Sequence, residues 1–238
     1  MGRFEAEKAA SRHLRDQVLS WGASLVGFAD LRGVAPSAFS HWPNGVCIAV
    51  ALEPMVMSGV LDGPTSEYYQ EYQRANRLLN DLAERSADFI SSSGHRAEAF
   101  PATIVDSFPG EEFDRTLSVA FQHKTAATRA GLGWIGKSAL LVTPEYGPRV
   151  RLATVFTDMP LEAGTPVTAG RCGDCRACVR ACPAGAIKGQ EWRVGLPRAE
   201  LVDVVACRAK MKQLLLERVG VEDAVCGVCL AVCPVGVR

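Results

Sequence analysis

The sequence predicts an α+β protein in two parts, an N-terminal domain over residues 1–158 and a cysteine-rich domain over residues 159–238. Helical and strand-like apolar patterns both occur in the first part. Eight of the nine cysteines lie in the last third of the chain. Between the parts, residues 158–170 are rich in Pro, Gly and Thr, a composition typical of a linker.

The N-terminal elements follow from apolar spacing. Apolar residues recur at helical intervals over residues 3–22, which predicts a first helix. Two apolar runs, residues 24–29 and 46–52, predict buried strands, and Cys47 in the second run is expected to be core. A helix-start signal predicts a long helix over residues 66–91. One face of that helix, expected either to line a pocket or to pack in the core, carries Tyr68, Tyr72, Ala75, Leu79 and Leu82.

The later elements are predicted in the same way. Residues 99–105 are expected to form a strand that ends in a turn, and residues 116–130 a helix that a glycine caps. Two apolar runs, residues 139–143 and 150–156, predict a hairpin with a long loop. In the cysteine-rich part, residues 197–219 are expected to form one helix.

The cysteine spacing predicts two 4Fe–4S clusters. The first run is C-x2-C-x2-C-x3-C-P, the bacterial ferredoxin pattern, in which the fourth cysteine serves the other cluster. A second run, C-x2-C-x3-C-P, follows a single distant cysteine. The ferredoxin rule then pairs Cys172, Cys175 and Cys178 with Cys233, and Cys207, Cys226 and Cys229 with Cys182.

Disulfides and zinc binding are two other uses of repeated cysteines. A disulfide scaffold fits poorly, because no secretion signal is recognisable and the cysteines are clustered. Two zinc sites of four cysteines each remain an alternative, although the doubled C-x3-C-P ending is not a zinc signature.

Composition narrows the class of protein further. The 238 residues include 26 basic and 26 acidic side chains, so the formal net charge is zero and nucleic acid is not the expected partner. No apolar run is long enough to span a bilayer, and the charged N-terminal segment has no signal-peptide core. We therefore expect a cytoplasmic protein without a membrane partner.

The stretch from Gly131 to Ser138 permits several interpretations. Its glycines match G-x-G-x-x-G, and with Lys137 they also match G-x4-G-K-[ST], the phosphate-binding loop. Both motifs need a preceding strand, whereas residues 123–130 favour a helix. Two readings remain beside a nucleotide site: glycines that let the backbone approach a large flat ligand, or a capped turn between a helix and a hairpin.

At this point the sequence resembles the epoxyqueuosine reductase family, cobalamin-dependent double-cluster enzymes related to reductive dehalogenases. The resemblance lies in residues 127–137, Leu140, Leu141, Gly147, residues 156–158 and the run from Cys172 to Pro183. It extends weakly upstream to Gly27 and to the tyrosine-rich helix.

The resemblance implies a nitroreductase-like N-terminal domain and a corrinoid held between it and the ferredoxin-type domain. The residues implied in cofactor binding are Lys124, Gly131, Leu132, Gly133, Trp134, Ile135, Gly136 and Lys137. Asp106 resembles the family's proton donor, although more residues separate it from the glycine stretch than in the family pattern. His123 lies nearer the glycines and is the second candidate for the catalytic proton source, against a structural role.

Two departures from the family shape the expected function. The sequence ends five residues after Cys233, which predicts a short form that lacks the C-terminal repeat domain and does not act on tRNA. It also lacks a twin-arginine leader. We expect an oxidoreductase that takes electrons from a ferredoxin or flavodoxin and passes them through two clusters to cobalt. The alternatives are an electron-transfer protein or activator that serves a partner corrinoid protein, and a phosphate-loop iron–sulfur protein.

Overall fold

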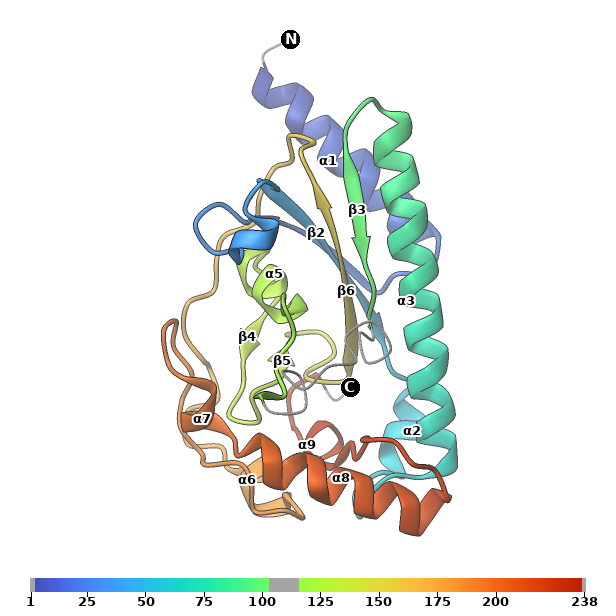
Figure 1. The fold of residues 1–238 in the computed structure, drawn as a ribbon, viewed down its shortest axis with the longest axis vertical. Helices are drawn as coiled ribbons and strands as arrows, with labels where there is room; N and C mark the ends of the chain where they lie inside the picture. The colour runs from blue at the N-terminus through green and yellow to red at the C-terminus, as the bar shows by residue number, and fades with distance from the viewer. Residues whose placement is uncertain (1–2, 103–115, 237–238) are drawn as a thin grey trace. The chain divides into compact units, whose positions relative to one another are not determined.

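The computed structural model describes residues 3–102 and 116–236, and within them the protein is α+β, as expected (Figure 1). The chain divides into two compact units. The sheet unit comprises Met1–Val50, Ala75–Leu132 and Arg151–Val167, and the cysteine unit comprises Ala51–Arg74, Gly133–Val150 and Thr168–Arg238. Each unit is assembled from segments distant in sequence. The domain boundary at residue 158 stays a prediction.

The sheet unit is built on a four-stranded sheet with the order β1-β2-β6-β3. The strands are β1 (Leu25–Asp30), β2 (Asn44–Ala51), β6 (Val150–Thr157) and β3 (Ala97–Phe100). β1 pairs antiparallel with β2, and β3 pairs antiparallel with β6. The interiors of β1 and β2 are buried without alternation, which is why the sequence shows continuous apolar runs there. Cys47 is fully buried in β2, so its predicted core position is confirmed.

The helices of this unit bury apolar stripes. α1 (Arg3–Ser20) and α5 (His123–Arg129) both contact β1. α3 (Ser66–Ser92) belongs to both units, and in the sheet unit it runs beside β3 (Figure 1). Its side chains Leu79 and Leu82 are fully buried. No helix among residues 3–102 and 116–236 combines the length and the apolar character that crossing a membrane requires.

An aromatic cluster explains why α5 is shorter than predicted. The rings of Phe39, Phe100, Phe121 and Phe156 contact one another, with Phe121 and Phe156 4.8 Å apart edge to face. Phe121 is 2% exposed, and the segment that carries it into the core is not helical. The backbone of Leu117 has a φ of 49°, outside the right-handed helical region. The predicted helix over residues 116–130 therefore begins at His123 instead.

The cysteine unit consists of short elements. It contains a strand pair, β4 (Trp134–Ile135) with β5 (Leu141–Val142). Its helices are α2 (Pro54–Ser58), α6 (Ala177–Ala181), α7 (Arg198–Leu201), α8 (Val204–Val219) and α9 (Val228–Ala231).

Two predictions for this region are wrong. Residues 139–143 and 150–156 do not pair as a hairpin, because β5 pairs with β4 and β6 joins the four-stranded sheet. The single helix over residues 197–219 is two helices. Val202 leaves the helix to pair with Ile187, and the Asp203 carboxylate then caps α8 by accepting hydrogen bonds from the amides of Val205 and Ala206.

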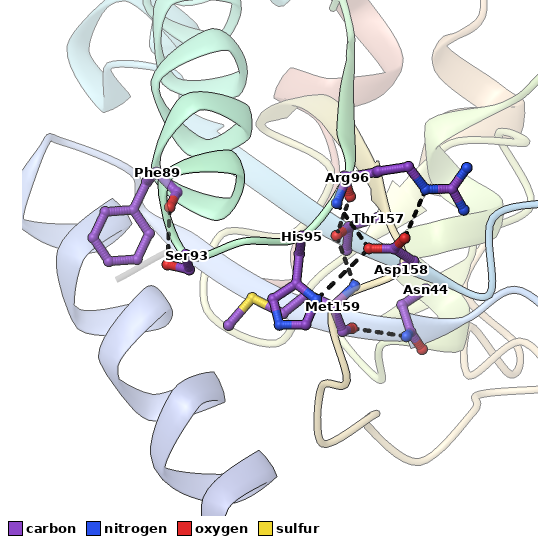
Figure 2. Close-up of polar contacts among 8 residues, drawn as sticks. All are labelled: Asn44, Phe89, Ser93, His95, Arg96, Thr157, Asp158 and Met159. Atoms are coloured by element: carbon purple, nitrogen blue, oxygen red, sulfur yellow. Dashed lines mark hydrogen bonds and ion pairs between the residues drawn. The ribbon is translucent and has the colours of Figure 1, made fainter.

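Asp158 fastens the turn between α3 and β3 to the end of β6 (Figure 2). Its carboxylate accepts hydrogen bonds of 2.8 Å from both the backbone amide and Nε of Arg96, and His95 Nδ1 lies 3.7 Å away. The Thr157 hydroxyl donates to the Arg96 carbonyl at 2.8 Å. These hydrogen bonds from Arg96 hold the pKa of Asp158 below its ordinary value of 3.8. Asp158, which is one of the residues that carry the resemblance, has a structural role here.

Replacing Asp158 with Asn should lower the free energy of unfolding by about 1 kcal/mol at pH 7, because the carboxylate makes charge-assisted bonds. Since the native pKa is lowered, this stabilisation is present above about pH 4 and is lost as the pH falls through the native pKa. Urea unfolding between pH 3 and pH 7 measures the difference. Asp81→Asn, which removes an exposed ion pair with Arg85, is the matched control and should change stability little. An equal effect of both substitutions at pH 7 would contradict the assignment.

Candidate iron–sulfur site

The eight cysteines of the cysteine unit lie on two short helices, one long helix and the loops beside them. Cys172 and Cys175 share a turn, in which the Cys175 amide donates to the Cys172 carbonyl at 3.1 Å. Cys178 is in α6 and Cys182 follows it, while Cys229 is in α9 between Cys226 and Cys233. Cys207 lies in the first turn of α8. All eight, which fall within the described residues, are free thiols and form no disulfide.

The electrostatic interactions among these thiols are consistent with the two sets expected from the ferredoxin rule. Cys178 interacts electrostatically with Cys172, Cys175 and Cys233. Cys207 interacts with Cys182 and Cys226, and Cys229 interacts with all three of these and with Cys178. We call Cys172, Cys175, Cys178 and Cys233 the first group, and Cys182, Cys207, Cys226 and Cys229 the second group. The fourth cysteine of each run lies with the other run.

Burial dominates the chemistry of these thiols. It raises the pKa of both Cys178 and Cys207 to about 11, and neighbouring thiols add to the effect. Burial also raises the pKa of Cys226, Cys229 and Cys233. Metal ligation requires thiolates, so binding must displace these protons, and a cationic metal centre supplies the compensating charge.

Hydrogen bonds to sulfur are also in place. Cys226 accepts a backbone hydrogen bond from Val228, and Cys233 accepts one from Val235. Burial raises the pKa of both thiols, and these hydrogen bonds oppose that effect. Such bonds to sulfur are one of the factors that set the potential of an iron–sulfur cluster. Within residues 3–102 and 116–236, no three Cys, His, Asp or Glu side chains converge closely enough to hold a single ion. A four-iron cluster is larger than one ion, and each of its cysteines binds a different iron.

Lys137 supports the first group from the glycine stretch. Its side chain is buried, and Nζ donates to the carbonyls of Gly173 and of Cys175, the latter at 3.2 Å. Nζ also lies 3.7 Å from Glu191, whose other oxygen accepts a 2.9 Å hydrogen bond from the Cys172 amide. A Cβ on Gly136 would lie 3.6 Å from the Cys172 sulfur. The sequence did not predict that Lys137 would bind the backbone of the cysteine turn. The only sequence signal for this contact is the position of the lysine directly after the glycines.

The glycine stretch does not have the context of a phosphate-binding loop. It follows helix α5 and not a strand, and the Lys137 ammonium is already bound to carbonyls. Gly131 has a φ of 75° at the end of α5, as a helix-capping turn requires. A Cβ on Gly133 would lie 2.2 Å from the Val142 carbonyl, so only glycine allows β4 and β5 to approach this closely here.

Trp134 supplies a buried donor that the described protein does not use. Its side chain is 6% exposed and lies in β4, with the Arg171 guanidinium 5.7 Å from the ring centroid. Among the described residues, its indole Nε1 and that of Trp42 are the buried side-chain nitrogens or oxygens that have no hydrogen-bond partner. A buried donor without an acceptor is costly, so such an atom points to water or to a ligand.

Of the two predicted proton donors, Asp106 and His123, the structure describes only His123. Asp106 lies outside the described residues. His123 lies in the sheet unit, with Nδ1 2.9 Å from the Thr154 hydroxyl and Nε2 2.9 Å from the Pro101 carbonyl. Since a carbonyl only accepts, Nε2 carries the proton and Nδ1 accepts from Thr154. Desolvation lowers the pKa of His123 to about 4, so the ring is neutral at pH 7. Lys124 is half-buried in the first turn of α5.

Comparison with known proteins agrees with the resemblance seen in the sequence. Residues 171–236 match the family described as 4Fe-4S double cluster binding domain. An epoxyqueuosine reductase from Pseudomonas aeruginosa is 30% identical over 185 residues, which are 75% of this chain and 46% of that protein. One from Listeria monocytogenes is 50% identical over 64 residues, 27% of this chain and 17% of that protein. The chain thus spans less than half the length of these curated relatives.

Solved structures show the same fold. A catabolic reductive dehalogenase superposes with a TM-score of 0.74 at 20% identity, covering 98% of this chain and 32% of that one. An epoxyqueuosine reductase from Bacillus subtilis superposes with a TM-score of 0.63 at 20% identity, covering 96% of this chain and 65% of that one. Another epoxyqueuosine reductase structure, with a TM-score of 0.62, contains a tRNA stem loop. The expectation that nucleic acid is not a partner therefore has no support from these relatives.

Single cysteine substitutions test the two groups. Cys182→Ser should remove the same EPR signal as Cys207→Ser, and Cys233→Ser the same signal as Cys175→Ser, because each pair shares one cluster. Bound iron after anaerobic reconstitution should fall from about eight to about four per chain in each variant. Cys47→Ala is the control and should keep the full iron content, because Cys47 lies in the core of the sheet. If Cys182→Ser instead removed the signal that Cys175→Ser removes, the crossed pairing would be wrong.

His123→Gln tests the neutral histidine. Because the native pKa is lowered from 6.5 to about 4, the neutral ring stabilises the fold above pH 6.5, and this contribution is lost as the pH falls toward 4. Unfolding of the wild type should therefore show a loss of stability over this interval that His123→Gln lacks. His41→Gln, at an exposed histidine, should keep the wild-type pH profile. An unchanged profile in His123→Gln would show that the ring does not titrate as inferred.

Proposed function

Because the chain is a relative of the epoxyqueuosine reductases, an oxidoreductase family, and carries a double-cluster domain, we propose that it is an iron–sulfur reductase that delivers electrons to a bound corrinoid. The observation that carries the proposal is the gathering of eight free thiols into two crossed groups of four. Both groups occur in one small unit, which suits transfer of electrons from one cluster to the next.

The chain's own residues would hold the corrinoid at the glycine stretch. Gly131 is exposed and Leu132 is partly exposed. The Trp134 indole provides a buried N–H that needs an acceptor, and the amide groups that fringe a corrin contain such carbonyls. When bound, the corrinoid would supply a cobalt centre for the reductive chemistry. The remaining residues of the stretch are buried and would contribute by fixing the backbone around Trp134. They are Gly133, Ile135, Gly136 and Lys137.

Protons would come from Asp106, whose segment resembles the family's donor segment apart from its longer distance to the glycine stretch. His123 is less suited, because both its ring nitrogens are engaged and its pKa is about 4. His123 would instead hold the Pro101 carbonyl, which precedes Asp106 by five residues in the sequence. The electron donor would be a low-potential ferredoxin or flavodoxin, and the setting would be the cytoplasm.

The competing function is an electron-transfer protein or activator that reduces a corrinoid on a partner protein. It would use the same two clusters but would need no corrinoid site of its own. The two functions differ in one measurable property, which is whether the reconstituted chain alone binds and reduces cobalamin.

Titration of the reconstituted protein with hydroxocobalamin, followed by absorbance and EPR under reducing conditions, should show stoichiometric binding and a base-off cobalt(II) signal. Trp134→Phe should weaken binding by up to about tenfold, because it removes one buried hydrogen bond and keeps the ring. Trp42→Phe, which removes the other unpaired indole N–H, should bind like the wild type. Full iron content without any change in the cobalamin spectrum would favour the electron-transfer protein.

A further inference from the structure

Arg149 is a buried cation held against the first cysteine group. Its side chain is 8% exposed. The guanidinium donates to the carbonyls of Leu230 and Cys233 at 3.1 and 2.9 Å, and also to the carbonyl of Val235. These carbonyls belong to the segment that carries Cys233, so the charge sits beside one ligand of the first group.

The backbone is built for this contact. Gly147, two residues before Arg149, has a φ of 58°, and Gly236 has a φ of 68°. A Cβ on Gly147 would overlap the Val235 carbonyl at 2.1 Å, and a Cβ on Gly236 would lie 2.3 Å from the Gly147 amide nitrogen. Both positions therefore require glycine, and together they let the C-terminal segment lie directly on the turn that precedes Arg149.

The charge of Arg149 is not balanced by a carboxylate. Carbonyl oxygens satisfy its donors but do not neutralise it, and in the described part of the chain it forms no ion pair. Burial lowers the pKa of Arg149, and the ionisable group that opposes this effect is Cys233, which would carry a negative charge as a metal-bound thiolate. A buried, unpaired guanidinium is costly, so the thiolates and sulfides of a cluster are the counter-charge that would make its burial favourable.

The two cysteine groups differ in their charged neighbours. Near the first group, Lys137 is paired with Glu191 at 3.7 Å, whereas Arg149 has only carbonyl partners among the described residues. Near the second group, the Asp203 carboxylate acts on Cys207 and the Arg218 guanidinium acts on Cys226, so opposite charges offset one another. Arg149 therefore places a buried positive charge beside the first group that no carboxylate offsets in the described part of the chain.

We propose that Arg149 raises the midpoint potential of the cluster held by the first group, so that this cluster accepts an electron before the cluster held by the second group. Reduction adds one electron to the cluster, which becomes more negative by one unit and is stabilised by a nearby cation. The electron comes from an external reductant, dithionite in the test, and no bond is formed or broken. The inference rests on the two-cluster part of the proposed function and not on the corrinoid.

The test is a potentiometric titration of the reconstituted 238-residue chain, read by EPR, with the two signals assigned by the Cys175→Ser and Cys207→Ser variants. In the wild type, the first-group signal should appear at the higher potential. Arg149→Gln should lower that midpoint by at least the equivalent of a tenfold change in the reduction equilibrium, about 59 mV for one electron. The midpoint of the second group should not move.

Arg149→Lys separates charge from packing, because it keeps the cation and loses the planar fork. It should retain most of the wild-type midpoint. Equal shifts in Arg149→Lys and Arg149→Gln would overturn the proposal in favour of a packing role, and so would an unchanged midpoint in Arg149→Gln. If Arg149→Gln failed to assemble the cluster, the wild-type order would still decide, since reduction of the second group first contradicts the proposal. If the protein did not bind cobalamin, the measured midpoint potentials of the two clusters and their order would still test the proposal.

Discussion

The cysteine unit depends on the burial of eight thiols that must become thiolates together. Burial raises the pKa of most of them, so without metal the protonated form is favoured. Charge then has to be supplied by the metal centres and by the residues around them. Beside the first group lie two buried cations, Lys137, which is paired with the exposed Glu191, and Arg149. The Gly136, Gly147 and Gly236 positions bring the backbone close enough for these charges to reach it.

The glycine stretch contacts the cysteine-bearing backbone and also contains the residue proposed to bind the corrinoid, Trp134. Its C-terminal half, Gly133 to Lys137, packs against β5 and the first cysteine turn, which explains the glycines without any ligand. The Trp134 N–H is the atom that this explanation leaves without a partner. Gly133 to Lys137 thus have a structural role in the cysteine unit, and the proposed ligand would accept a hydrogen bond from the Trp134 N–H.

The sequence allowed prediction of what depends on local spacing. The cysteine pattern predicted the two groups, and the apolar periods of α1, β1, β2 and α3 predicted those elements. Strand pairing was not predictable from spacing. β5 pairs with β4 because Gly133 allows close approach, and β6 enters the central sheet. The start of α5 depends on Phe121 joining an aromatic cluster whose other members are distant in sequence. Arg149 gave no local signal at all, since its partners lie more than 80 residues away along the chain.

The measurement that most directly tests the central claim is anomalous diffraction at the iron edge from crystals of the reconstituted protein. The account predicts two separate iron peaks, one enclosed by Cys172, Cys175, Cys178 and Cys233 and the other by Cys182, Cys207, Cys226 and Cys229. A single peak, a zinc signal in place of iron, or Cys182 and Cys172 around the same peak would contradict it.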